Sequence, residues 1–82
     1  MENERGIEIM KLYFERSNGE MVFVCESCGK CADADIRDYV KKLNPNYKIY
    51  YTRYWNADEE RFHRIYDIGS HTEFFHLIDE GD

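Results

Sequence analysis

An Asn-Gly pair at positions 18–19 constrains the fold of this chain more than any other feature. It separates two runs that are rich in apolar residues, 7–16 and 21–25. Asn-Gly between such runs is a strong hairpin signal, because a two-residue type I′ turn needs positive φ at both central positions. The sequence therefore predicts a β-hairpin near the start of the chain.

The register of this predicted hairpin can be counted outward from the turn. Phe14 then faces Phe23, and Leu12 faces Cys25. Aromatic and apolar side chains that meet across two strands stabilise a sheet. Because alternate residues of a strand share one face, we expect these four side chains on the face that becomes the core.

A helix is predicted over residues 33–43. Its apolar residues recur at helical spacing and make one stripe, which consists of Ile36, Tyr39, Val40 and Leu43. Asp33 or Asp35 is expected to cap the start and to favour the positive end of the helix dipole. Asn44 precedes a proline, which pushes its backbone out of the helical region and ends the helix.

The rest of the chain is rich in strand-forming residues. Three more strands are predicted, over residues 47–55, 61–68 and 72–78, with Gly69-Ser70 as a two-residue turn between the last two. The expected fold class is α+β with the order ββαβββ, a mostly antiparallel sheet with one helix packed on one face. We expect a single domain over residues 1–82, with flexible tails at 1–6 and 79–82.

The charge balance narrows the classes of function. The net charge is −6, which argues against direct binding of nucleic acid, because that needs a basic surface to neutralise phosphates. The same charge permits an acidic protein that mimics nucleic acid and competes for a basic groove.

The sequence shows no segment that would direct the chain to a membrane or out of the cell. No apolar run approaches the roughly 20 residues that span a bilayer, and the charged N-terminus does not resemble a secretory signal. We expect a cytoplasmic protein.

Three cysteines, Cys25, Cys28 and Cys31, lie within seven residues and are the only ones in the chain. The Cys-x-x-Cys-Gly spacing after a strand resembles a zinc knuckle, in which glycine permits the tight turn that points both thiolates inward. A structural zinc site needs four ligands, so a histidine or a second copy of the chain would have to complete it. Zinc is therefore one candidate cofactor, and a metal-free loop is the alternative.

Two further chemical patterns have weaker support. Cys28 and Cys31 just precede the predicted helix, as in thioredoxin-like redox sites, but the βαβ pattern of those proteins is absent. The predicted turn at 69–70 would place His63 opposite His76, where the two rings could share a metal or form a pH-sensitive pair. The sequence contains no nucleophile elbow, phosphate loop or metalloprotease helix, so we expect no enzyme.

The surplus aromatic residues indicate a protein partner. The run 47–55 holds more aromatic side chains than one small core can take, and Tyr, Trp and Arg are enriched at interface hot spots. We expect Arg53, Tyr54 and Trp55 to anchor a partner on the open side of the sheet. The acidic helix residues Asp33, Asp35 and Asp38 would form a charged rim, and a homo-oligomer is compatible with this pattern.

The stretch 66–75, Tyr-Asp-Ile-Gly-Ser-His-Thr-Glu-Phe-Phe, together with Tyr54-Trp55 before it, is similar to a segment of small uncharacterised proteins from phages and prophages of Gram-positive bacteria. The resemblance covers roughly residues 47–78. It implies a small, acidic, non-enzymatic accessory protein that is encoded by a phage, lies in the host cell cytoplasm, binds host machinery and inhibits a host or defence factor. The cysteine cluster is not part of the shared pattern.

Overall fold

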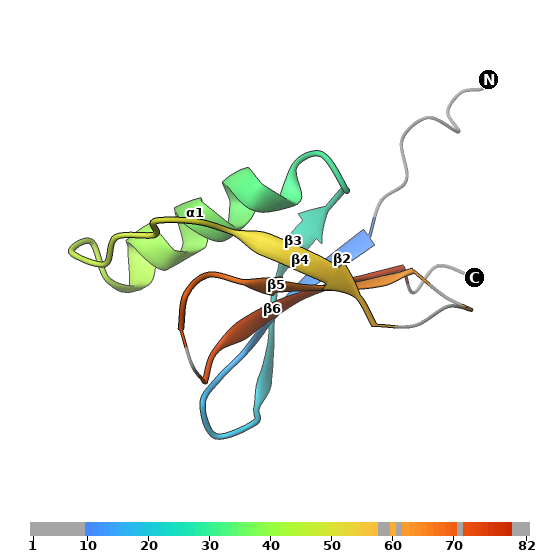
Figure 1. Cartoon of the computed structure of the whole chain (residues 1–82), viewed down its shortest axis with the longest axis horizontal. Coiled ribbons are helices and arrows are strands. Elements are labelled where there is room, and N and C mark those ends of the chain that lie inside the picture. Colours follow the sequence, from blue (N-terminus) through green and yellow to red (C-terminus); the bar gives the residue numbers. More distant parts are fainter. Residues whose placement is uncertain (1–9, 58–59, 61, 71, 80–82) are drawn as a thin grey trace.

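The computed structural model describes residues 10–57, 60, 62–70 and 72–79, which form five strands and one helix. The strands make one antiparallel sheet in the order β3-β2-β6-β5-β4, and the helix covers one face of it (Figure 1). The predicted ββαβββ order and α+β class are confirmed. The elements are β2 (Met10–Glu15), β3 (Met21–Ser27), α1 (Ala32–Leu43), β4 (Arg53–Asn56), β5 (His63–Asp67) and β6 (Phe74–Ile78).

The predicted tails lie outside the described residues, except Asp79. Its backbone N–H donates a 3.0 Å hydrogen bond to the carbonyl of Phe62, so this residue belongs to the ordered sheet end. The first residues of the predicted strand 7–16 also lie outside the described part, as does residue 61 of the predicted strand 61–68.

The β2–β3 hairpin forms, but its turn is longer than predicted. The backbone N–H of Arg16 donates to the carbonyl of Glu20 at 2.8 Å, so the two residues bracket a loop of three. Gly19 has φ of 91°, and no other described residue of the loop has positive φ, which rules out a type I′ turn. The register near the turn is therefore shifted, and Phe14 faces Val22 instead of Phe23.

A β-bulge then restores the predicted register. The pairing shifts between Leu12 and Tyr13, so that Leu12 faces Cys25 as predicted while Tyr13 faces Phe23. A bulge places one extra residue on one strand and changes which face the following side chains occupy. Phe23 consequently lies on the face away from the helix, where 52% of its surface is exposed. The prediction that placed Phe23 in the core is wrong.

The pairing of β5 with β6 differs from the prediction by two residues. His63 faces Ile78, and His76 faces Ile65, because the connection between the strands is longer than the Gly69-Ser70 turn alone. A shift of two residues keeps every side chain on its expected face, whereas a shift of one would reverse it. His63 and His76 therefore stay on the same face as diagonal neighbours.

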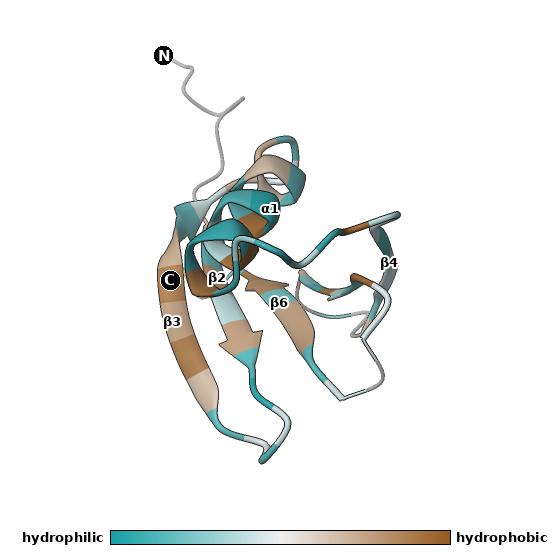
Figure 2. Cartoon of the chain, turned by 90° about the vertical axis from the view of Figure 1, so that its left-hand side faces the viewer, coloured by the Kyte–Doolittle hydropathy of each residue, from teal (hydrophilic) through white to brown (hydrophobic). Residues whose placement is uncertain are grey.

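The core lies between the sheet and α1. Leu12, Ile36, Phe75 and Leu77 are fully buried there, and Tyr39 packs its ring on Phe75 at 6.0 Å. The predicted helix stripe is confirmed at Ile36 and Val40, but Leu43 at the last turn is exposed. Figure 2 shows α1 in front of the β2 side of the sheet, with β4 at the opposite edge. In the described part of the chain, no helix has the length and apolar character needed to cross a membrane.

The start of α1 differs from the prediction. The helix begins after Cys31, which occupies the N-cap position, and the Cys31 side chain makes no capping hydrogen bond to the first turn. Asp33 and Asp35 lie in the first turn, where their charge favours the positive end of the helix dipole. The prediction that one of them caps the helix is wrong.

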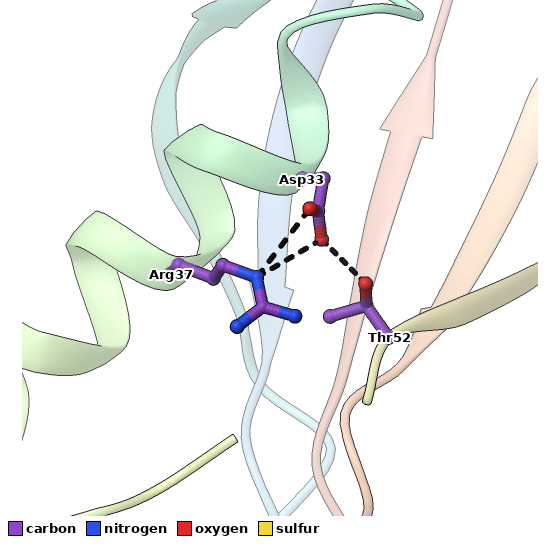
Figure 3. A network of polar contacts seen from close by, with 3 residues as sticks. All are labelled: Asp33, Arg37 and Thr52. Carbon is purple, nitrogen blue, oxygen red and sulfur yellow. Dashed lines mark hydrogen bonds and ion pairs between the residues drawn. The ribbon is translucent and has the colours of Figure 1, made fainter. Parts of the chain in front are cut away.

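The predicted strand 47–55 is reduced to β4. Residues 47–52 make no strand in the structure; they cross from the end of α1 to the far edge of the sheet. Ile49 packs against the core on the way. At the end of the crossing, the hydroxyl of Thr52 donates to the carboxylate of Asp33, which also bonds Arg37 (Figure 3). These contacts hold the crossing segment against the helix, so the strand propensity of the tyrosines does not decide the structure there.

Candidate binding surface on the open sheet face

The sheet face opposite α1, which we call the open face, carries one continuous row of large side chains. Pairing across the strands aligns them in the order Trp55, Ile65, His76, Tyr13 and Phe23, one residue from each strand. Neighbouring strands lie about 4.8 Å apart, so this central row is about 19 Å long across five strands. The row places an aromatic ring at each edge of the sheet.

The two ends of the central row are exposed and its middle is covered. Trp55 is 46% exposed and Phe23 is 52% exposed, while His76 in the middle is buried. Each end residue is supported by a second aromatic ring. Trp55 meets Phe74 edge to face at 6.3 Å between centroids, and Phe23 meets Tyr13 at 5.7 Å. These contacts restrict the side-chain motion of both exposed rings.

A chain of polar contacts occupies the middle of the open face. The Nε2 atom of His76 lies 2.7 Å from Oε1 of Glu15, and its Nδ1 atom lies 2.9 Å from Nε2 of His63. A carboxylate only accepts hydrogen bonds, so Nε2 of His76 donates to Glu15. In the neutral imidazole, Nδ1 is then the acceptor that faces Nε2 of His63. The buried imidazole is thereby satisfied on both nitrogens. The predicted proximity of the two histidines is confirmed, and the carboxylate beside them was not predicted.

The structure separates the three residues that were expected to act together on β4. Arg53 and Trp55 lie on the open face, where Arg53 pairs with Asp67 at 3.2 Å. Tyr54 lies on the other side, because successive side chains of a strand point to opposite faces. Its ring contacts Tyr66 at 5.3 Å between centroids.

Arg64 gives Tyr54 its second contact on the helix side. The guanidinium lies 3.9 Å from the centre of the Tyr54 ring, and its Nη1 donates to the hydroxyl of Tyr66 at 3.0 Å. Burial raises the pKa of the Tyr66 hydroxyl, and the hydrogen bond from Arg64 opposes that increase. Arg64 Nη1 also lies 3.8 Å from the point that a Cβ atom on Gly29 would occupy, so this side chain reaches the cysteine turn.

The acidic helix residues lie on the helix side of the sheet and bind partners within the chain. Asp33 contacts Arg37 and Thr52, as Figure 3 shows. Asp35 accepts a 2.6 Å hydrogen bond from the buried hydroxyl of Ser27, and Asp38 forms an exposed ion pair with Lys42 at 3.7 Å. These carboxylates are therefore not brought together with Arg53 and Trp55 on one surface.

The three cysteines divide into a pair and a separate thiol, and all three are free. The Sγ atoms of Cys28 and Cys31 lie 2.8 Å apart in the turn before α1. Cys25 lies opposite Leu12 on β3 and packs partly buried against the core. Within the described ranges, no group of three or more His, Cys, Asp or Glu side chains is arranged to hold a metal ion.

The pKa values of the three thiols are shifted from the ordinary value in different directions. The hydrogen bond with Cys31 lowers the pKa of Cys28, and the same contact raises the pKa of Cys31. Burial raises the pKa of Cys25, with a further contribution from the carboxylate of Asp35. Of the three, Cys28 is therefore the thiol that ionises most readily.

A groove of ≈ 380 Å³ opens on the helix side, between the end of α1 and the sheet. Val22, Leu43 and Tyr47 supply apolar wall, and Arg16 and Glu73 add one charge of each sign. The groove and the open face belong to opposite sides of the sheet, so a molecule in one would not contact the other.

Sequence reasoning missed Phe23 and Phe74 as members of the open face, and it missed the contact of Glu15 with His76. Phe23 was missed because nothing in the local sequence marks the bulge that moves it. The alternation of residues 72–78 does contain a signal for Phe74, since it shares parity with His76. No protein-family model matches the chain, and neither a curated protein nor a solved structure is significantly similar to it.

Proposed function

We propose that the chain is a small non-enzymatic protein that acts by binding another protein through the open face. The observation that carries this proposal is the central row, in which Trp55 and Phe23 remain exposed at the two ends although each is backed by a second ring. Aromatic side chains held in place before binding lose little entropy on association. Such residues are the usual hot spots of protein interfaces.

The polar chain in the middle supports a rigid surface. His76 is buried and its two nitrogens are bonded to Glu15 and His63, so a partner need not satisfy them. Polar networks that are fully satisfied hold their surroundings in one arrangement. The open face therefore offers two aromatic anchors separated by a fixed, filled centre.

Charge and resemblance favour a particular kind of partner. The net charge of −6 favours association with a basic protein, because long-range attraction speeds the encounter of opposite charges. The resemblance of residues 66–75 to small phage and prophage proteins supports a bacterial target, with inhibition of a host or defence factor as the outcome. The acidic residues of α1 are not part of this surface; Glu15, Glu26 and Asp67 supply its negative charge.

The test is affinity capture from a Gram-positive bacterial lysate with immobilised wild-type protein and three variants. Trp55→Ala and Phe23→Ala each remove one end of the central row. Tyr50→Ala is the matched control, since Tyr50 is a more exposed aromatic residue, at 86%, and lies in the crossing segment outside the sheet. The captured protein is then purified, and its dissociation constant is measured with each variant.

We expect Trp55→Ala to weaken binding at least about 30-fold, which corresponds to a hot spot of about 2 kcal/mol, and Tyr50→Ala to leave it unchanged. Equal affinity for wild type and both open-face variants would overturn the proposal. Sedimentation of wild type as a dimer that Trp55→Ala dissolves would assign the open face to a second copy instead. Binding that disappears with salt but not with either substitution would favour nucleic-acid mimicry.

A further inference from the structure

The turn between β3 and α1 holds two thiols within bonding reach. The carbonyl of Cys28 accepts backbone hydrogen bonds from Cys31 at 3.1 Å and from Ala32 at 2.9 Å, so the turn is closed by the backbone itself. The two Sγ atoms are 2.8 Å apart. A disulfide bond is about 2.05 Å long, so the sulfurs need to approach by only about 0.8 Å to form one.

The pair is accessible, and the third thiol is kept apart from it. Cys31 is exposed and Cys28 is partly exposed, so a small molecule can reach both sulfurs. Cys25 faces Leu12 and packs against the core on β3. An oxidant therefore meets a defined dithiol and not three equivalent thiols.

We propose that Cys28 and Cys31 form a thiol–disulfide exchange site that is reversibly oxidised by low-molecular-weight disulfides of the glutathione type. The site is independent of the proposed binding function, because it lies in the turn that leads to the helix and the binding surface lies on the opposite face of the sheet. No thioredoxin-like fold is needed for the reaction, since the closed turn alone brings the sulfurs together.

The exchange takes place in two steps. The thiolate of Cys28 attacks one sulfur of the small disulfide RS–SR, whose S–S bond breaks, and RS⁻ leaves with the proton that Cys28 lost. Cys31 then gives its proton to solvent and attacks the Cys28 sulfur, and a second RS⁻ leaves and is protonated. The chain loses two electrons and two protons, and the small disulfide is reduced to two thiols.

The hydrogen bond between the two thiols favours Cys28 as the first nucleophile. The two sulfurs are in hydrogen-bond contact, and the thiolate of Cys28 is favoured there because it accepts a hydrogen bond from the thiol of Cys31. Asp35 in the first helical turn opposes ionisation of both thiols, because a negative charge destabilises a nearby thiolate. Cys31 lies 2.8 Å from the Cys28 sulfur, so it can attack that sulfur as soon as Cys28 has formed the mixed disulfide.

The experiment equilibrates the full chain in mixtures of reduced and oxidised glutathione, quenches with acid and alkylates the remaining thiols before mass analysis. The reduced chain should carry three alkyl labels, and the oxidised chain should carry one, on Cys25. Without the mass of the labels, the oxidised chain should be about 2 Da lighter than the reduced chain, because it has lost two hydrogens. Reduced glutathione should return all three labels. Cys25→Ser is the matched control and should oxidise as wild type does.

Cys31→Ser separates the two steps. It should accumulate the mixed disulfide between Cys28 and glutathione, whereas wild type should hold less than about one tenth as much, because attack within the turn has a high effective concentration. Far-ultraviolet circular dichroism checks that each variant is folded. Equal adduct in wild type and Cys31→Ser, a disulfide that includes Cys25, or a disulfide between two chains would overturn the proposal.

Discussion

Replacing Glu15 with alanine should destabilise the protein through a residue on a neighbouring strand. Glu15 is the carboxylate that accepts the 2.7 Å hydrogen bond from Nε2 of His76. The imidazole side chain is only 10% exposed, so water cannot easily replace the lost partner. An unsatisfied buried donor costs about 1–3 kcal/mol, and we expect Glu15→Ala to lower the free energy of unfolding by about 2 kcal/mol.

The measurement is urea unfolding followed by circular dichroism, with thermal unfolding as a second readout. A loss of 2 kcal/mol in a domain of this size corresponds to a decrease in Tm of about 8–16 °C. Glu20→Ala is the control, since Glu20 is an acidic residue of the same hairpin whose side chain forms an exposed ion pair with Arg16. Its effect should stay within about 0.5 kcal/mol.

A double-mutant cycle with His76→Leu assigns the loss to the hydrogen bond. In the His76→Leu protein there is no buried donor for Glu15 to satisfy, so Glu15→Ala should then cost less than about 0.5 kcal/mol. The reasoning is refuted if Glu15→Ala, made in the wild type, lowers the free energy of unfolding no more than Glu20→Ala does. It is equally refuted if Glu15→Ala costs as much with leucine at position 76 as with histidine.

Three further results are expected. Leu12→Ala should lower the free energy of unfolding by about 2–5 kcal/mol in urea, because Leu12 is fully buried at the centre of the core. Gly19→Ala should cost about 1 kcal/mol in the same assay, because its φ of 91° lies in the region that disfavours a Cβ atom. As pH rises toward neutral, Cys28 should be alkylated before Cys25 and Cys31 in a mass-spectrometric time course, because its pKa is lowered and theirs are raised.

Much of the fold could be predicted because its signals are local. The hairpin follows from Asn18-Gly19, and α1 follows from apolar residues at helical spacing that end before Pro45. The histidine contact could also be predicted, because an error of two residues in register preserves the face of each side chain. These features depend on periodicity and turn chemistry, which the sequence displays directly.

The rest depends on tertiary packing. The three-residue loop shifts the pairing next to the turn, whereas Leu12 still pairs with Cys25 farther along the strands. The register shift between Leu12 and Tyr13, a β-bulge, reconciles the two, and no residue near it signals a bulge in the sequence. Residues 47–52 have high strand propensity, but they run as an irregular segment, with Ile49 packed against the core and Thr52 bonded to Asp33. The division of Arg53, Tyr54 and Trp55 between two faces follows from strand alternation once β4 is paired.

Zinc binding stays a prediction, since the described residues assemble two thiols and not a three-ligand group. Elemental analysis of protein purified without chelator measures it directly. About one zinc per chain, or half a zinc if two chains share the metal, would support a metal module. A metal-free, folded protein would leave Cys28 and Cys31 to the exchange chemistry proposed above.

The central claim is that the open face contacts the partner, and Trp55 reports on it directly because it is the only tryptophan in the chain. Its indole N–H gives a single resonance in the spectrum of the ¹⁵N-labelled protein. The captured partner should shift or broaden this resonance in proportion to binding, together with the amides of β4 and those of β3 around Phe23, while those of α1 change little. An unchanged indole resonance with shifts confined to α1 would contradict the account.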